Sequence, residues 1–293
     1  MDILQRIYMR SVAIVDPSKV CSTVFGARLR CDSRQFVQRR IRYFGIFEHS
    51  LTYFTQEWLQ EGDVYVDIGA NIGYFSLLAS QCVGPAGQVI AIEADPQNYE
   101  ELLENLALNK CANVAPLNIA ATRNFCKVDI RRVPRNSGAN SVIEAKEGSV
   151  QGTPLREILG KDAGRINFIK IDIEGSEAPV LEAIREMIEL FPARLAIAVE
   201  INAASGTEVE RFADADFDVY AIQNVYGIDY YLLRSYLGRY GEDYTVKLTP
   251  VKAYIQGHRD YVFIRRGHKN LALGPVRGGA ESSSAPDLGL TVA

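Results

Sequence analysis

The feature that most constrains the fold is a short apolar run that leads directly into a glycine-rich turn. Residues 64–68 are Val, Tyr, Val, Asp and Ile, and the turn that follows carries Gly69 and Gly73. An apolar run of this length predicts a buried strand. Glycines let the chain turn sharply and let its backbone approach a ligand closely. A helical pattern follows to about residue 80, so the segment predicts a strand, a turn and a helix whose free N–H groups face the turn.

The same alternation of apolar runs and helical patterns continues along the chain. After the second run, Asp95 and Pro96 are typical of a helix N-cap and of the first helical residue. Strands that alternate with helices favour a mostly parallel, doubly wound α/β sheet with helices on both faces. Seven strands are predicted, at residues 64–68, 88–93, 114–119, 168–172, 195–200, 217–223 and 261–265.

Three segments depart from this rhythm. Residues 1–60, whose second half is rich in aromatic side chains, predict an N-terminal cap over the edge or mouth of the sheet, and 61–266 predict the main domain. Residues 267–293 are rich in Gly and Ser without a periodic apolar pattern, which predicts a disordered tail. Residues 122–165 are irregular and hold a basic run that we interpret as a solvated strand face rather than a contact for an acidic acceptor: Arg123, Lys127, Arg131, Arg132 and Arg135.

Composition excludes several classes of protein. The 293 residues carry a net charge of −4, so no basic field favours nucleic acid as a partner. Five cysteines without a C-x-x-C pair argue against a disulfide framework or a structural zinc site. The sequence holds neither a signal-peptide core nor an apolar run long enough for a membrane span, so we expect a cytoplasmic protein. The sequence does not predict an oligomeric state.

The residues around the glycine turn distinguish between two nucleoside cofactors. A dinucleotide fingerprint places glycines at 69, 71 and 74, whereas this chain has Gly69, Asn71 and Tyr74. Asp67, directly before the turn, would repel a diphosphate and attract the ammonium and sulfonium of S-adenosylmethionine (SAM). An NAD(P)-dependent oxidoreductase is therefore the less favoured alternative, and a glycine turn without a ligand is a third.

Glu93 ends the second predicted strand. A carboxylate there can accept hydrogen bonds from both hydroxyls of a ribose. Nicotinamide and SAM enzymes share this feature, so it predicts a nucleoside without choosing between them. The alternative interpretation of Glu93 is a helix-capping or surface carboxylate.

The run at 169–174 places charges where a central parallel strand is normally apolar. Alternation puts Lys170, Asp172 and Glu174 on one face and three isoleucines on the other. Buried charges need a partner or a function. Two interpretations stay open: an ion-pair network that fixes the strand end, or a position for Asp172 beside the sulfonium or the acceptor oxygen.

Three ordered motifs resemble the FkbM-family methyltransferases: VDIGANIGY at 66–74, AIEADP at 91–96 and IKIDIEGSE at 169–177. The resemblance covers about residues 45–202 and takes in Asn105, Asn109, Asn118 and the Asn140-Ser141 pair. It implies a Rossmann-like class I methyltransferase fold, SAM as cofactor, and usually an oxygen acceptor on a sugar, a glycan or a small natural product. The positions expected to bind the cofactor are Asp67, Gly69, Ala70, Asn71, Gly73, Glu93, Ala94 and Asp172.

Methylation of an alcohol is helped by a general base, for which Asp172, Glu48, His49 and His258 are candidates. A magnesium site is an alternative, because Asp172, Glu200 and Asn202 end adjacent predicted strands and offer oxygen ligands. A non-catalytic binding protein with a SAM-enzyme fold is a second rival. The predicted catalytic residues are Asp172, Glu174, Lys170 and His49.

Overall fold

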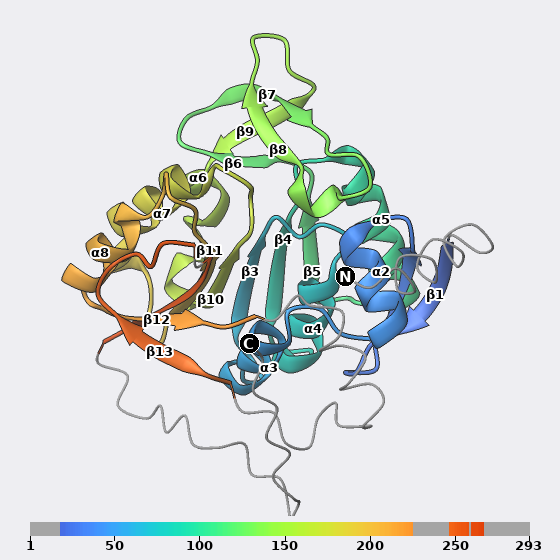
Figure 1. Ribbon diagram of the computed structural model, residues 1–293, viewed down its shortest axis with the longest axis horizontal. Coiled ribbons are helices and arrows are strands. Elements are labelled where there is room, and N and C mark those ends of the chain that lie inside the picture. Colours follow the sequence, from blue (N-terminus) through green and yellow to red (C-terminus); the bar gives the residue numbers. More distant parts are fainter. Residues whose placement is uncertain (1–17, 225–245, 258, 267–293) are drawn as a thin grey trace, which may run out of the picture.

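The computed structural model describes residues 18–224, 246–257 and 259–266 (Figure 1). Its centre is an eight-stranded sheet in the order β5-β4-β3-β10-β11-β14-β12-β13. The strands from β5 to β11 run parallel, whereas β14 is antiparallel to both of its neighbours. Their bounds are β3 Val64–Ile68, β4 Gln88–Ile92, β5 Val114–Leu117, β10 Ile166–Ile171, β11 Ala196–Glu200, β12 Phe217–Ile222, β13 Leu248–Val251 and β14 Asp260–Arg265.

The seven predicted strands are present, and their ends differ from the predicted ones by at most two residues. The sheet has one more strand than predicted, because β13 pairs with β12 at the edge. The chain runs from β3 outward to β5 and then returns to place β10 on the other side of β3. This reversal is the switch point at which open α/β sheets bind ligands, beyond the carboxyl ends of the strands.

Helices cover both faces of the sheet (Figure 1). Phe54, Leu77 and Leu102 pack on one face, and Leu155, Leu181 and Phe212 belong to the core on the other. Asp95 is the N-cap of α5 and accepts a hydrogen bond from the Gln97 N–H, as predicted. The helices are α3 His49–Trp58, α4 Tyr74–Val83 and α5 Pro96–Leu108 on the first face, and α6 Leu155–Leu159, α7 Glu177–Glu186 and α8 Thr207–Asp214 on the second.

The described part of the N-terminal segment, residues 18–60, forms the cap. It contains the hairpin of β1 (Ser18–Ser22) and β2 (Arg28–Asp32), then α2 (Phe36–Phe44) and α3. One buried amide ties this cap to the domain. Asn105 on α5 accepts from the Arg30 N–H at 2.8 Å and donates to the Ile72 carbonyl at 2.9 Å. The hairpin, α5 and the glycine turn therefore meet at a single side chain.

Most of the segment predicted to be irregular, 122–165, belongs to a small sheet over residues 120–154 that we call the flap (Figure 1). Its basic run does not lie on a uniformly solvated strand face, since Arg123 pairs with Glu182 of α7 and Arg132 pairs with Asp95. The strands are β6 Ala120–Thr122, β7 Cys126–Arg131, β8 Ser141–Glu144 and β9 Val150–Pro154, in the order β6-β9-β7-β8.

Two further predictions concern the C-terminal tail and membrane-spanning segments. The predicted tail at 267–293 lies outside the described residues. Within the residues that are described, no helix is both long enough and apolar enough to cross a membrane.

Candidate active site

Two cavities open at the carboxyl ends of β3, β4 and β10. The flap cavity, of about 620 Å³, lies between the sheet and the flap and is lined by Glu93, Asn140 and Val142 among others. The cap cavity, of about 1020 Å³, lies between the sheet and the cap. The two cavities share Gly69, Asn71, Gly138 and Asp172, so they meet at the glycine turn.

The glycine turn is fixed by its backbone. The N–H groups of Gly69 and Ala70 both donate to the Ile92 carbonyl at 2.9 Å. Gly69 has φ of 86°, and a Cβ there would lie 1.9 Å from the Asp172 carbonyl oxygen. Any other residue would push β3 and β10 apart at the cavity junction. Asn71 also has a left-handed backbone conformation, with φ of 50°, although it is not a glycine.

Glu93 is held at the floor of the flap cavity. Its Oε2 accepts from the Asn71 N–H at 2.7 Å, and its Oε1 accepts from the Asp95 N–H at 2.8 Å. Burial raises the pKa of Glu93 to about 7, although these two hydrogen bonds favour the ionised form. The N-cap of α5 is Asp95 rather than Glu93. The Glu93 carboxylate is thus oriented within the cavity and retains lone pairs for further donors.

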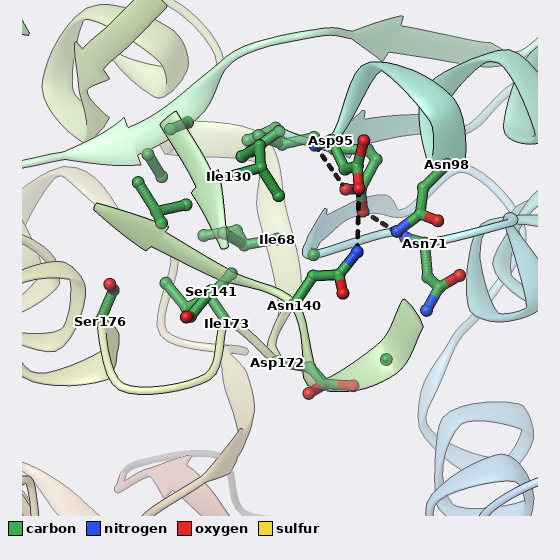
Figure 2. Close-up of a pocket in the computed structure, with 18 of the residues that line it drawn as sticks. Ile68, Asn71, Asp95, Asn98, Ile130, Asn140, Ser141, Asp172, Ile173 and Ser176 are labelled. Atoms are coloured by element: carbon green, nitrogen blue, oxygen red, sulfur yellow. Dashed lines mark hydrogen bonds between the residues drawn. The ribbon is translucent and has the colours of Figure 1, made fainter. Parts of the chain in front are cut away.

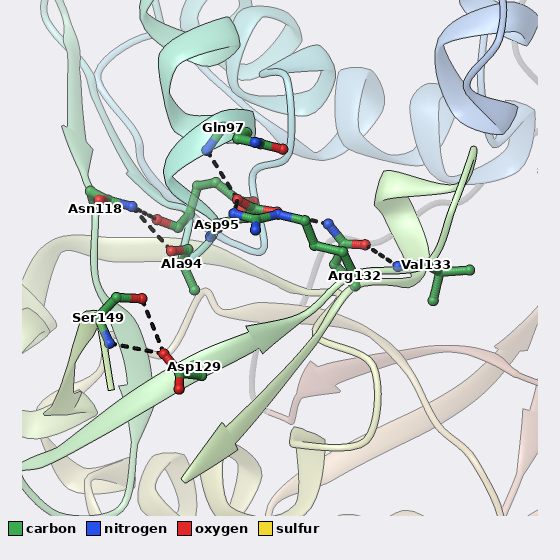
Figure 3. Close-up of polar contacts among 10 residues, drawn as sticks. Ala94, Asp95, Gln97, Asn118, Asp129, Arg132, Val133 and Ser149 are labelled. Atoms are coloured by element: carbon green, nitrogen blue, oxygen red, sulfur yellow. Dashed lines mark hydrogen bonds and ion pairs between the residues drawn. The ribbon is translucent and has the colours of Figure 1, made fainter. Parts of the chain in front are cut away.

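The flap is fastened to the domain through Asp95, a contact that we did not predict. Arg132 donates from Nε and Nη2 to the two carboxylate oxygens at 2.9 and 2.7 Å, and Asn140 donates to Oδ2 at 2.8 Å (Figures 2 and 3). Asp95 is 2% exposed. We call this set of contacts the clasp. Because Asn140 also lines the flap cavity, the clasp fixes the outer wall of that cavity.

A buried ion-pair chain crosses the junction of the cavities. Lys170 Nζ lies 3.0 Å from Asp172 Oδ2 and 4.0 Å from Asp67 Oδ1, and Ser76 donates to Asp67 at 2.6 Å. Burial lowers the pKa of Lys170, but Asp172, Asp67 and Glu48 outweigh it and raise that pKa overall. Asp172 thus forms the ion pair of the first interpretation of the 169–174 run. It also lines both cavities, and its position beside the sulfonium or the acceptor oxygen stays a prediction.

The cap cavity combines aromatic rings with carboxylates. Arg259 pairs with Glu174 at 3.3 Å and also with Glu200. Burial raises the pKa of Glu200 to about 8, and repulsion from Asp172 adds to this shift. The rings and carboxyl groups that line the cavity are those of Phe36, Phe47, Tyr74, Phe75, Glu48, Asp67, Asp172, Glu174 and Glu200.

Not all of the remaining predicted site residues line one of the two cavities. His49 is 1% exposed in the first turn of α3 and is not among the residues that line either cavity, whereas the neighbouring Glu48 is. His258 lies outside the described residues. Asn202 Oδ1 accepts from the Ala204 N–H at 2.8 Å within its own turn. Over the described parts of the chain, no group of three or more His, Cys, Asp and Glu side chains could hold a metal ion. Asn202 is not among the residues that line the cap cavity with Asp172 and Glu200.

The site fits a cofactor that carries both an amino-acid end and a nucleoside. Asp67 Oδ1 and Asn71 Oδ1 are buried acceptors without a hydrogen-bond donor among the described residues, and both residues line the cap cavity. They suit an ammonium group. Glu93 in the flap cavity suits the hydroxyls of a ribose. Tyr74 stands where a dinucleotide site needs a third glycine, and its hydroxyl accepts from the Phe47 N–H of the cap.

The parallel sheet with its reversal beside β3, the antiparallel β14 and the acidic residue after β4 define a class I methyltransferase. Residues 67–227 match the sequence profile described as the methyltransferase FkbM domain. The chain belongs to this family of SAM-dependent methyltransferases. Membership of this family identifies the cofactor as SAM rather than NAD(P).

Several characterised proteins are similar to parts of this chain. The methyltransferase sdnD of Sordaria araneosa is 24% identical over 157 residues, which cover 41% of this chain and 60% of that protein. The tRNA(Phe) (4-demethylwyosine(37)-C(7)) aminocarboxypropyltransferase of Methanocaldococcus jannaschii is 44% identical over 57 residues, or 20% of this chain and 22% of that protein. The chain thus spans less than two thirds of the length of the curated relatives that it matches.

Among solved structures, a SAM-dependent O-methyltransferase from Thermotoga maritima aligns with 87% of this chain and 80% of its own. The identity is 13% and the TM-score is 0.42.

Proposed function

We propose that this methyltransferase transfers a methyl group to a hydroxyl oxygen of a sugar, a glycan or a small polyhydroxylated natural product. The observation that carries the proposal is the lining of the cap cavity, where Phe36, Phe47 and Phe75 face the same space as several carboxyl groups. Aromatic rings pack against the apolar faces of such molecules, and carboxylates accept hydrogen bonds from their hydroxyls.

The same lining disfavours nucleic acid as the acceptor. Glu48, Asp172, Glu174 and Glu200 surround the cap cavity, against the two cations Lys170 and Arg259. Nucleic-acid sites instead present basic residues to phosphates. The net charge of the whole chain, −4, is unfavourable for a polyanion as well.

The roles of the cofactor-binding residues follow from the two cavities. We assign the ribose hydroxyls to Glu93, and the amino-acid end to Asp67, Asn71 and the turn that includes Ala70 and Gly73. Ala94, which also lines the flap cavity, belongs to the nucleoside site. SAM, when bound, supplies an electrophilic methyl group on a positively charged sulfur.

The roles of the acceptor-side residues follow from the ion-pair chain. Asp172 lines both cavities, so we assign its carboxylate to a hydrogen bond with the acceptor hydroxyl. Lys170 fixes the Asp172 carboxylate through the 3.0 Å contact. Glu174, paired with Arg259, lines the cap cavity. Holding an acceptor oxygen in line with the methyl group can account for roughly 7–11 kcal/mol of the barrier.

The test is an incubation of the full chain with methyl-deuterated SAM and an extract of the source organism. We expect label in small molecules or glycans as an ether-linked methyl group that survives mild alkali, with one S-adenosylhomocysteine formed per methyl transferred. The matched control is Glu93→Ala, which should transfer little label. Label that appears only in nuclease-sensitive material, in amines or in alkali-labile esters would contradict the proposal. No S-adenosylhomocysteine with any fraction would favour a non-catalytic SAM-binding protein.

A further inference from the structure

Two of the five cysteines lie side by side in the hairpin that β1 and β2 form in the cap. Cys21 of β1 stands opposite Leu29, and Cys31 is two residues further along β2, so both thiols are on the same face of the hairpin. Their sulfur atoms are 3.4 Å apart. The sulfurs of a disulfide are about 2.05 Å apart. A short further approach would therefore join the two thiols.

The two thiols differ in exposure and in proton affinity. Cys31 is fully buried, whereas Cys21 is partly exposed. A hydrogen bond with Cys31 lowers the pKa of the Cys21 thiol, burial opposes this shift, and the charge of Arg42 adds to it. The same hydrogen bond, together with burial, raises the pKa of the Cys31 thiol. Because the thiolate is the attacking form of cysteine, Cys21 is suited to react first with a reagent from solvent, and Cys31 to react second.

The other three cysteines lie on separate elements. Cys82 is in α4, Cys111 follows the end of α5, and Cys126 begins β7 of the flap. Burial raises the pKa of Cys82 to about 11, which disfavours its thiolate. These residues provide internal comparisons for the reactivity of the pair in the hairpin.

The segment enclosed by the two hairpin cysteines contacts the glycine turn at two points. The ring of Phe25 packs edge-on against that of Tyr74, which directly follows the turn, with 5.3 Å between the ring centroids. The Arg30 N–H donates to Asn105, which itself donates to the Ile72 carbonyl of the turn. A crosslink reduces the number of opened conformations of the segment that it closes. It would therefore favour the hairpin in its docked position.

We propose that Cys21 and Cys31 are a modification site for low-molecular-weight disulfides, and that the bond formed between them holds the hairpin against the glycine turn. First, the Cys21 thiolate attacks one sulfur of the reagent, whose S–S bond breaks and releases a thiolate. Then Cys31 loses its proton to solvent, its sulfur attacks Cys21 Sγ, and the second thiolate of the reagent leaves with the bonding pair. The two cysteine sulfurs are oxidised. The reagent is reduced to two thiols, which take up the two protons that the cysteines lost.

The test uses the full chain and oxidised glutathione. After incubation, the remaining thiols are blocked by alkylation and the tryptic peptides are identified by mass spectrometry. Trypsin places Cys21 in residues 20–28 and Cys31 in residues 31–34, so the bond is detected as a linked pair of peptides. We expect this pair to form faster than any adduct at Cys82 and to be reversed by dithiothreitol. Glutathione that stays attached to Cys21 in the wild-type protein, or oxidation of other cysteines without this pair, would overturn the proposal.

Single variants separate the two roles. Cys31→Ala removes the second thiol, so glutathione should accumulate on Cys21 as a mixed disulfide. Cys21→Ser removes the first thiol, so the buried Cys31 should stay reduced. Cys111→Ser, at a partly exposed thiol outside the hairpin, is the matched control and should form the bond as the wild type does. Glutathione that attaches to Cys31 in Cys21→Ser as fast as to Cys21 in Cys31→Ala would overturn the assigned order. If Cys31→Ala does not fold, the linked peptides of the wild type still decide whether the bond forms.

The contact with the glycine turn has a separate measurement. SAM should dissociate several-fold more slowly from the oxidised protein than from the reduced protein, because the crosslinked hairpin opens less often. Stopped-flow measurement of SAM release tests this, and dithiothreitol should restore the faster rate. Oxidised glutathione should leave the rate unchanged in Cys21→Ser, which cannot form the bond. Equal rates in the oxidised and reduced wild-type protein would overturn the proposed hold on the glycine turn.

Discussion

The flap cavity and the cap cavity meet at Asp172, yet their carboxylates are arranged in opposite ways. In the flap cavity, Glu93 and Asp95 accept hydrogen bonds from fixed backbone, amide and guanidinium donors. In the cap cavity, several carboxyl groups compete for Lys170 and Arg259. Carboxylates whose hydrogen-bond donors are all fixed make a rigid binding site. Carboxyl groups that share too few cations change their protonation when a further charge enters the site. On the roles proposed above, this difference separates cofactor recognition in the flap cavity from chemistry in the cap cavity.

The largest effect should come from Asp172, the charged residue among those shared by both cavities. Asp172→Asn keeps the shape of the side chain and removes the charge that faces Lys170, so turnover should fall roughly 10²-fold or more through loss of acceptor orientation. SAM affinity should change much less. The measurement is S-adenosylhomocysteine formed per folded molecule, with Asp129→Asn on the flap as the matched control. Near-normal turnover in a folded Asp172→Asn protein would remove this residue from the acceptor site.

The next largest effect should fall on cofactor binding. Glu93→Ala removes the acceptor assigned to two ribose hydroxyls and frees the N–H groups of Asn71 and Asp95, so SAM affinity should fall by about 1–3 kcal/mol. This corresponds to a dissociation constant roughly 5- to 150-fold higher. Calorimetry measures it, and Glu100→Ala on the exposed side of α5 is the control. Unchanged affinity would place the ribose elsewhere.

The binding of S-adenosylhomocysteine should depend on pH through Glu93. The pKa of Glu93 in the folded protein is raised to about 7 by burial, and ribose hydroxyls donate best to its ionised form. Affinity should therefore be full above pH 7 and weaken as the pH falls below it, by at most about tenfold per unit. Titrations from pH 5.5 to 8.5 measure this slope. A slope that persists in Glu93→Gln would assign the proton to another group.

The smallest effect should come from the clasp. Arg132→Met removes two hydrogen bonds to Asp95 and leaves the one from Asn140, so the flap should open more often. We expect SAM to dissociate several-fold faster, because binding differences of this kind act mostly on dissociation rates. Stopped-flow measurement of SAM release tests this, with the exposed Arg131→Met as control. Equal rates in the two variants would show that the flap does not limit release.

The parts of the site that could be predicted directly follow strands of the main sheet. Asp67, Gly69, Glu93 and the 170–172 pair follow strands whose apolar runs are unmistakable, so their meeting at one sheet edge follows from topology alone. The flap could not be predicted in this way, because its strands are three to six residues long and obtain their pairing from distant partners.

Side chains supplied by the cap were harder to rank. His49 was chosen for the chemistry of its side chain, yet the helical turn that buries His49 places Glu48 in the cavity. Glu48 has a left-handed backbone conformation before α3, and no sequence pattern predicted this conformation. The clasp similarly joins residues far apart in the chain, although the Asn140-Ser141 pair in the family resemblance was a signal for it.

The amide of Asn105 has a consequence for engineering this enzyme. Changing the acceptor by exchanging the cap for that of a relative is an obvious design, since the cap supplies Phe36, Phe47 and Glu48. However, Asn105 accepts from the β2 backbone at Arg30 while it donates to the glycine turn at Ile72. A transplanted cap that offers no N–H group at the position of Arg30 would leave the buried amide oxygen of Asn105 without a donor. Asn105 would then hold the glycine turn at Ile72 less firmly. Chimeras that exchange only α2 and α3, and keep the native hairpin, would change the acceptor pocket without that loss.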